Sequence, residues 1–243
     1  AAKIRLPRTH HGTALDAVLI NPAGGLTGGD RLDWSVDVGP GASAIVTTQA
    51  CEKIYRAIDD SAHVSTDIRL HEGASLSWLP QETILFDGSA LDRQLNIEMA
   101  TDAGLLVVEP LILGRKAMGE TVQQAAFHDR WRIRRNGRLL HAEDLRLEGD
   151  IVGRTGRKTA TQGNLAMASV LLVHRDAADM GEAVRRLLGP LAGASAIRSS
   201  TGDRLVVRIV AADGFELRRQ LIPVIDRCNQ KLSGSRLPKI WTV

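Results

Sequence analysis

The sequence predicts a mostly β fold: a β-helical body of stacked β-coils, followed by a C-terminal α+β part that contributes two helices. Three observations support this fold class. Several segments alternate apolar and polar residues, a Gly-Ala-Ser frame recurs after about thirty residues, and helical spacing of apolar residues begins only near residue 165. We therefore expect residues 1–165 to form the stacked β body and residues 166–243 to form an α+β appendage, packed together as one unit.

The repeat is clearest in VGPGASAIVTTQ (38–49) and LHEGASLSWLPQ (70–81). Their Gly-Ala-Ser triplets begin at Gly41 and Gly73, and an apolar stretch and a glutamine follow each. A weaker copy, MATDAGLLVVEP, occupies 99–110. One such β-unit cannot bury its apolar face alone, so neighbouring copies should stack. We expect the triplets to form turns at equivalent positions on adjacent layers; the alternative is a sandwich whose turns resemble one another by chance.

An alternating segment precedes each copy of the repeat. These segments are LDWSVDV (32–38), VSTDIRL (64–70) and LNIEM (95–99). Because side chains point to opposite faces of a strand in turn, this alternation predicts strands with one buried and one wet face.

A β-hairpin is expected within the body at 131–142, where an Asn-Gly pair supplies a strong two-residue turn signal. A two-residue loop pairs Ile133 with Leu140 and Arg130 with Glu143 across the strands. The arginines of this segment then form an outward face that acidic residues partly match.

After residue 165 the expected order is strand, helix, strand, strand, helix. The strands are 169–175, 194–200 and 204–212. The first helix should begin after the N-cap Asp176 and stop at Gly189, ahead of a proline. Its apolar face comprises Met180, Val184, Leu187 and Leu188.

The last helix should begin at a capping box formed by Asp213 and Glu216, and Pro223 should bend it. Its apolar face comprises Leu217, Leu221, Val224, Ile225, Cys228 and Leu232. Cys228 is therefore most simply a core residue.

Composition limits the classes of protein to which the chain can belong. The chain has 243 residues, 44% of them hydrophobic, which is enough for a sizeable core. The formal net charge of +3 is too small to indicate nucleic-acid binding by itself. Cys51 and Cys228 form no CxxC motif, which indicates a reduced chain, although one disulfide is compatible with their number. The sequence has no apolar run of membrane-span length and no signal-peptide core at its start, so we expect a cytoplasmic protein without a membrane partner.

The stretch NPAGGLTGGD (21–30) resembles a phosphate-binding loop only superficially. Counting from Gly24, the third position of a dinucleotide fingerprint is Leu26, and the Gly-Lys-Ser/Thr ending of a nucleotide-triphosphatase loop is replaced by Gly28-Gly29-Asp30. We interpret the glycines as tight turns that need positive φ or close backbone approach.

Catalytic motifs are not recognisable. The histidines are scattered, with no ligand spacing beyond the His10-His11 pair, and Glu143 and Asp144 should point to opposite faces of a strand. Two other classes stay open. A β-helical carbohydrate-active enzyme would need two carboxylates in an open groove. A basic RNA-binding module would use the hairpin arginines Arg130, Arg132, Arg134, Arg135 and Arg138, with Trp131 as their interleaved aromatic residue.

Four unusual loops, in this order and spacing, carry a resemblance. They are NPAGGLTGGD (21–30), TTQACEKIYRA (47–57), LPQETILFDG (79–88) and LGRKAMGE (113–120). From about Leu19 to Gly149 the chain closely resembles the family of the urease accessory protein UreD, called UreH in some organisms. The matching positions are Gly24, Gly25, Gly28, Gly29, Asp30, Gln49, Lys53, Tyr55, Arg56, Pro80, Gln81, Glu82, Gly114, Arg115, Gly119 and Glu120.

The resemblance implies a β-helical body with two helices and a non-enzymatic scaffold for urease maturation. Such a protein binds UreF, and through it the GTPase UreG, and docks on the urease apoprotein. It assembles with UreF into a larger complex and passes nickel inward through a tunnel. The implied cargo is transient Ni²⁺, with no tightly bound cofactor and no nucleic-acid partner.

Glu82 is the candidate for a transient nickel ligand, through its oxygen atoms. Its neighbours Leu79, Ile84, Leu85 and Phe86 indicate a partly buried segment. The structural alternative is that Glu82 forms a buried ion pair with an arginine such as Arg56 or Arg115.

Overall fold

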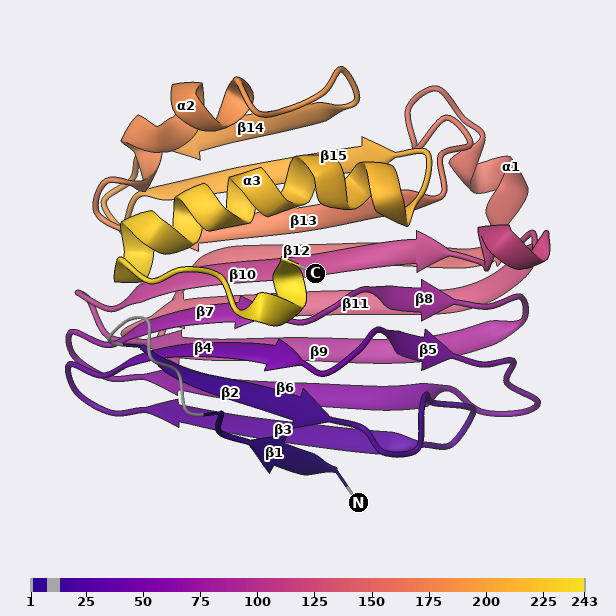
Figure 1. Ribbon diagram of the computed structural model, residues 1–243, viewed down its shortest axis with the longest axis horizontal. Coiled ribbons are helices and arrows are strands. Elements are labelled where there is room, and N and C mark those ends of the chain that lie inside the picture. The colour runs from indigo at the N-terminus through magenta and orange to yellow at the C-terminus, as the bar shows by residue number, and fades with distance from the viewer. Residues whose placement is uncertain (1, 8–13, 243) are drawn as a thin grey trace.

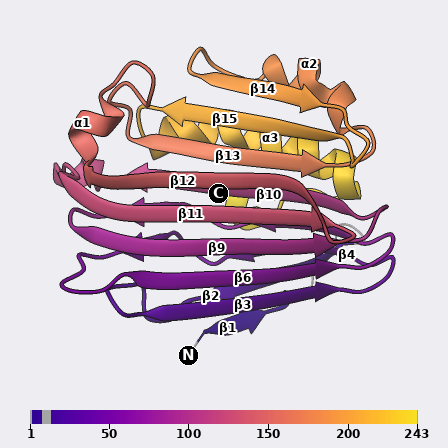
Figure 2. The same ribbon diagram turned by 180° about the vertical axis from the view of Figure 1, so that it is seen from behind.

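The computed structural model describes residues 2–7 and 14–242, so the His10-His11 pair lies outside the described residues. Two β-sheets face each other, and a long helix covers the outer face of the larger one (Figures 1 and 2). We call the larger sheet the long sheet and the smaller one the short sheet. The strand order in the long sheet is β1 (Lys3–Arg5), β2 (Leu15–Ile20), β4 (Ser43–Thr48), β7 (Ser75–Leu79), β10 (Gly104–Leu113), β13 (Ala166–Val173), β15 (Arg204–Ala211) and β14 (Ala192–Ile197). Two short strands of the same sheet, β5 (Glu52–Ile54) and β8 (Thr83–Leu85), pair with each other, and β8 also pairs with β10. The short sheet has the order β12 (Arg138–Asp150), β11 (Gln124–Arg135), β9 (Ser89–Met99), β6 (Ala62–Leu70) and β3 (Arg31–Val38).

The chain coils between the two sheets. It passes from β2 to β3, from β4 through β5 to β6, from β7 through β8 to β9, and from β10 to β11. Strands of successive coils pair in parallel in both sheets. Each coil therefore buries its apolar faces against its neighbours, and the predicted stacked β-coil body is confirmed.

The Gly-Ala-Ser turns stack as predicted. Ser43 lies opposite Ser75, and Ser75 lies opposite Gly104 in the next coil. Gly41 and Gly73 have φ angles of +66° and +65°, a conformation that glycine adopts without a Cβ clash. The turns thus occupy equivalent positions on adjacent layers.

The three alternating segments form β3, β6 and the end of β9, side by side in the short sheet (Figure 2). Their inward side chains line up between the sheets, as in the row Ile68, Ile97 and Ile133. This row packs against Trp78 and Val107 of the long sheet in one core cluster.

The hairpin has the expected loop, but its predicted register is wrong. Ile133 lies opposite His141 and Arg130 lies opposite Asp144, because the ladder is irregular between Ile133 and Arg134. Leu140 is the additional residue of this bulge. The bulge brings Leu140 into the core beside Ile133, with 5% of its surface exposed.

The C-terminal part continues the long sheet past residue 165: β13 pairs with β10, β15 with β13, and β14 with β15, all antiparallel. Both predicted helical regions are present. The first is a 3₁₀ turn, η2 (Ala177–Met180), that runs into α2 (Gly181–Arg185). It ends four residues before the predicted stop at Gly189, and the residues in between form hydrogen-bonded turns, Leu187 N–H to the Val184 carbonyl and Leu188 N–H to that of Arg185. Asp176 makes no side-chain cap and is instead paired with Lys231.

The second helix, α3 (Gly214–Ser233), lies across the long sheet (Figure 1). Asp213 caps it by accepting a hydrogen bond from the Glu216 N–H at 3.0 Å. Cys228 and most of the predicted apolar face are buried against the sheet, and both cysteines are free thiols. The remaining helical segments are η1 (Lys116–Met118), α1 (Ile151–Thr155) and η3 (Lys239–Trp241).

Candidate functional site

The glycine-rich stretch 21–30 packs its backbone against the next coil. Gly25 lies so close to the Tyr55 ring that a Cβ atom there would collide with it, and a Cβ on Gly28 would meet the carbonyl oxygen of Asp60. Asp30 closes the turn, since its carboxylate accepts a hydrogen bond at 2.8 Å from the backbone N–H three residues earlier. Positive φ angles occur at Gly24, Gly25 and Gly29. The close approach and positive φ that the sequence predicts are therefore present.

All four family loops meet at the end of the coils opposite the Gly-Ala-Ser turns. The Arg115 guanidinium lies 4.2 Å from the centre of the Phe86 ring, and Tyr55 meets the same ring edge-on at 5.1 Å. Glu120 accepts from Arg115 at 2.8 Å, and this hydrogen bond lowers the pKa of the Glu120 carboxyl. Arg56 lies beside them, and together these residues border an open cavity of about 610 Å³.

Glycine and exposed apolar residues shape the loop around this cavity. Gly114 and Gly119 both have positive φ, and they bracket the 3₁₀ turn η1. Ile58 and Met118 carry large apolar side chains that are exposed by 92% and 74%. Exposed apolar side chains beside an aromatic and charged cluster are typical of surfaces that bind another protein.

The remaining family positions separate into exposed and buried residues. Gln49 and Lys53 are exposed. Pro80, Gln81 and Glu82 are buried under the C-terminal part of the chain. The structure therefore places the sequence-predicted residues in two groups, one at the loop end and one around Glu82.

Glu82 is buried on the side of the long sheet that α3 covers, with 2% of its surface exposed. One carboxylate oxygen accepts a hydrogen bond from the Cys51 thiol at 3.2 Å. The other lies 3.6 Å from the Arg218 guanidinium of α3, beyond hydrogen-bond distance, and has no hydrogen-bond partner among the described residues. Arg218 instead donates to Gln81 at 2.9 Å and stacks over Trp241.

The predicted ion-pair partners of Glu82 are wrong. Arg56 is paired with Asp87, and Arg115 is paired with Glu120. Arg218, which follows Glu82 by well over a hundred residues, supplies the nearby charge because α3 packs on β10, β13 and β15 and also contacts β7. The buried pair exists, but it joins the body to the C-terminal helix.

Cys51 is held as a neutral thiol. Burial and the negative charge of Glu82 together raise the pKa of Cys51 to about 12. At neutral pH the thiol is therefore a hydrogen-bond donor to Glu82 rather than a thiolate.

A second group of buried charges lies between the two sheets. Arg93 donates two hydrogen bonds of 2.9 Å to Asp129, and it lies 2.7 Å from Glu109. Trp78 donates to Glu109 and Trp131 donates to Asp129 through their indole N–H groups. Burial and the neighbouring Asp129 raise the pKa of Glu109, against the opposing effect of Arg93. We call Arg93, Glu109 and Asp129 the interior triad.

Consecutive residues connect the triad to Glu82. Thr83 points between the sheets, and its hydroxyl oxygen accepts a hydrogen bond from Arg93 at 3.0 Å. Glu82 points to the other face of the same sheet, toward α3. A set of buried polar side chains therefore runs through the long sheet at residues 82 and 83.

The interior triad was not identified from the sequence, although a signal was available. In the segment LDRQLNIEM, Arg93 falls on the inward side of a period-two pattern with Leu95 and Ile97. Asp129 falls likewise between Phe127 and Trp131. A charge at an inward position of a strand indicates a buried polar group that needs a partner.

The two carboxylates between the sheets do not form the open groove that a carbohydrate-active enzyme would use. Glu109 and Asp129 are close neighbours, but both are buried and both bind Arg93. On the hairpin, Arg130 is paired with Asp92 and Arg132 with Asp144, which reduces the net positive charge of that face.

Two further features concern the residues that the structure describes. Within 2–7 and 14–242, no three side chains of His, Cys, Asp or Glu gather in a way that could hold a metal ion. In the same ranges, no helix has both the length and the apolar character needed to span a membrane.

Comparison with known proteins identifies the family. The family model "UreD urease accessory protein" matches residues 1–242. The urease accessory protein UreD of Rhizobium rhizogenes is 50% identical, over 100% of this chain and 86% of that protein. The protein of the same name from Chelativorans sp. is 50% identical over 99% of this chain and 84% of its own length, and that from Mesorhizobium japonicum is 46% identical over 100% and 85%. With a family match along almost its whole length and relatives at this identity, the chain belongs to the UreD family of urease accessory proteins.

Proposed function

We propose that this protein acts in urease maturation as a non-catalytic scaffold. In this proposal it docks UreF, and through UreF the GTPase UreG, on apo-urease, and it conducts nickel to the urease active site. The names of its relatives support the role in maturation. One structural observation supports the conduction of nickel: buried carboxylates lie on both faces of the long sheet and are joined through Glu82 and Thr83.

The chemistry around Glu82 suits a transient cargo. Ni²⁺ accepts carboxylate oxygen and neutral donors as ligands, and Glu82 offers an oxygen that no hydrogen bond occupies among the described residues. Arg218 lies close enough to balance the carboxylate charge when no cation is present. A site with so few donors binds weakly, so an ion would be able to leave again.

The loop end supports the docking role. Tyr55, Phe86 and Arg115 form a fixed aromatic and cationic cluster, with Ile58 and Met118 exposed beside it. Aromatic residues and arginine dominate the energetics of protein interfaces. The proposal therefore assigns protein contacts to this end of the coils.

The substitution Glu82→Gln tests the nickel path. The substitution removes the negative charge of the carboxylate, and the amide oxygen of the new side chain can still accept a hydrogen bond from the Cys51 thiol. We expect the variant to fold and to co-elute with UreF, while urease activation with UreF, UreG and nickel slows about tenfold or more. Full activation would eliminate Glu82 from the path.

The matched control is Glu52→Gln. Glu52 is a half-buried carboxylate on the neighbouring strand β5, and it accepts a hydrogen bond from Asn21 at 3.0 Å. We expect the Glu52→Gln variant to activate urease like the unmodified protein.

A thermal melt of the Glu82→Gln variant separates a nickel ligand from a structural ion-pair partner, because loss of a structural ion pair would lower the melting temperature and the yield of the UreF complex.

A further inference from the structure

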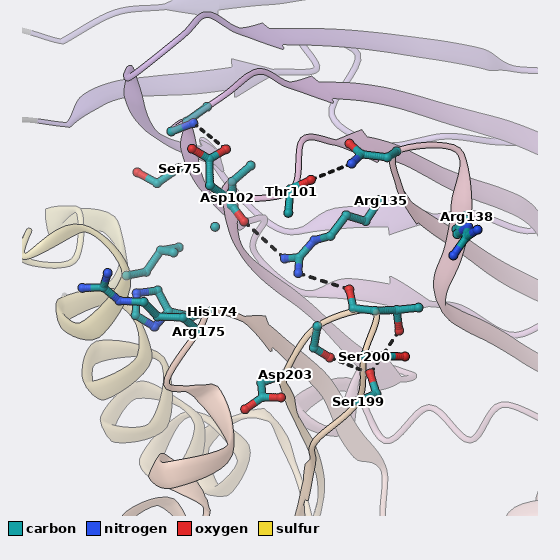
Figure 3. Close-up of a pocket in the computed structure, with 18 residues that line it drawn as sticks. Ser75, Thr101, Asp102, Arg135, Arg138, His174, Arg175, Ser199, Ser200 and Asp203 are labelled. Atoms are coloured by element: carbon teal, nitrogen blue, oxygen red, sulfur yellow. Dashed lines mark hydrogen bonds between the residues drawn. The ribbon is translucent and has the colours of Figure 1, made fainter.

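A cavity of about 840 Å³ lies at the other end of the coils (Figure 3). Its border is formed by the turns at 73–75 and 101–104, the tip of the β11–β12 hairpin, residues 174–175 after β13, the loop at 199–203 between β14 and β15, and Leu232 of α3. The cavity is therefore bordered by both the stacked coils and the C-terminal strands. It shares no residue with the loop end or with the Glu82 group.

Arg135 crosses this cavity from the hairpin. Its guanidinium donates to the carbonyl oxygen of Thr201 at 3.2 Å and to that of Ala103 at 3.4 Å (Figure 3). Its Nε–H is buried and has no acceptor among the described residues. Gly202 makes this placement possible, because a Cβ atom at that position would collide with the guanidinium. Arg135 thus fixes the loop and keeps a donor without a partner.

A second arginine supports the same loop from β15. Arg204 donates to the Ser199 hydroxyl at 3.2 Å, and its Nε–H is also buried without an acceptor among residues 2–7 and 14–242. Buried donors of a charged group are costly to leave unpaired. These two Nε–H groups are closed off from solvent, so a ligand in the cavity would meet the guanidinium charge of Arg135 rather than these donors.

The rim of the cavity adds positive charge. Arg138 and Arg175 are exposed and form no ion pair with any residue that the structure describes. The lining also holds two carboxylates: Asp102 accepts from the Gly73 N–H at 3.0 Å, and Asp203 lies 4.0 Å from Arg198, so three arginines outnumber two acidic side chains around the cavity.

His174 contributes a neutral donor rather than a metal ligand. Its Nδ1 accepts a hydrogen bond from the backbone N–H of Asp176 at 3.1 Å, so its Nε2 carries the proton. Burial lowers the pKa of His174, which keeps the ring neutral. His174 therefore adds an N–H donor to the lining.

We propose that this cavity binds an acidic peptide segment, one that carries two or more carboxylates, from a protein partner. Arginine pairs with carboxylates through two parallel hydrogen bonds, and three guanidinium groups spread over a wide, open cavity suit several carboxylates better than one small anion. Among the described residues, no Phe, Tyr or Trp lines the cavity to stack against a base, which disfavours a nucleotide or RNA. The inference rests on the proposed scaffold role in one respect only, namely that the acidic segment belongs to a protein partner.

Fluorescence anisotropy with fluorescein-labelled hexaglutamate tests the proposal on the purified full chain, without urease or UreF. Failure here would therefore leave the activation experiments unaffected. We expect saturable binding that weakens with salt. In the double variant Arg138→Gln/Arg175→Gln the affinity should fall about tenfold.

The control is Arg134→Gln/Arg146→Gln, which removes the same charge from exposed positions on the short sheet. It should bind hexaglutamate within about twofold of the unmodified protein. Equal loss in both variants would show diffuse electrostatic attraction and overturn the proposal. Binding of inorganic phosphate without binding of hexaglutamate would also overturn it, in favour of a small-anion site.

Discussion

At the scale of single residues, the interior triad is the most unusual feature of the body. Two carboxylates share one guanidinium between the sheets, so the local charge is negative if all three groups are ionised. Taking charges out of water is expensive, and here one carboxylate exceeds what Arg93 can neutralise. The raised pKa of Glu109 is the direct consequence.

This raised pKa predicts a pH dependence of stability. A carboxyl group with a higher pKa in the folded state binds its proton more tightly there. Its contribution to stability is therefore present below the ordinary pKa of 4.5 and is lost as the pH rises toward the raised value. Each unit of pKa shift corresponds to about 1.4 kcal/mol.

The substitution Glu109→Gln isolates this effect. We expect the unmodified protein to lose stability relative to the variant as the pH rises from 4.5 to 8, measured by urea unfolding at each pH. The remaining Arg93–Asp129 pair is then balanced one to one. A stability difference that does not change with pH would contradict the assigned direction of the Glu109 shift.

At the scale of elements, α3 connects the two sites on which the proposed function rests. It covers the long sheet, brings Arg218 to Glu82, and begins beside the loop end, where Lys116 is paired with Asp213 at 2.6 Å. Its start therefore depends on Asp213 in two ways, as a cap and as an ion-pair partner.

Removal of the cap should loosen this helix. Asp213→Ala deletes the hydrogen bond to the Glu216 N–H, and such a loss costs about 0.5–2 kcal/mol. Lys116→Ala removes only the surface pair and should cost less than about 1 kcal/mol. Unfolding in denaturant measures both, and equal costs would show that the cap is not the stabilising element.

The elements also show which parts of the structure the sequence could predict. The stacked coils follow from periodic signals, namely the alternation of 32–38 and the repeated Gly-Ala-Ser turns. The hairpin register could not be predicted, since the bulge at Leu140 is set by burial against the opposite sheet. The partner of Glu82 could not be predicted either, because Arg218 reaches it only through the packing of α3.

At the scale of the whole molecule, the two ends of the coils differ in chemistry. The family loops gather at one end around Tyr55, Phe86 and Arg115, and the arginine-lined cavity lies at the other. Between them the buried polar residues cross the long sheet beside α3. This arrangement suits a protein that holds partners at its ends and an ion path in its body.

The most direct test of this account follows nickel itself. UreG loaded with nickel is mixed with UreF, this protein and apo-urease, with and without excess ethylenediaminetetraacetate, and the nickel in purified urease is quantified by mass spectrometry. If nickel travels inside the complex, the chelator should leave most of the transfer intact, and Glu82→Gln should reduce it. Complete interception of the nickel by the chelator, with equal transfer by the unmodified protein and Glu82→Gln in its absence, would contradict conduction through this protein.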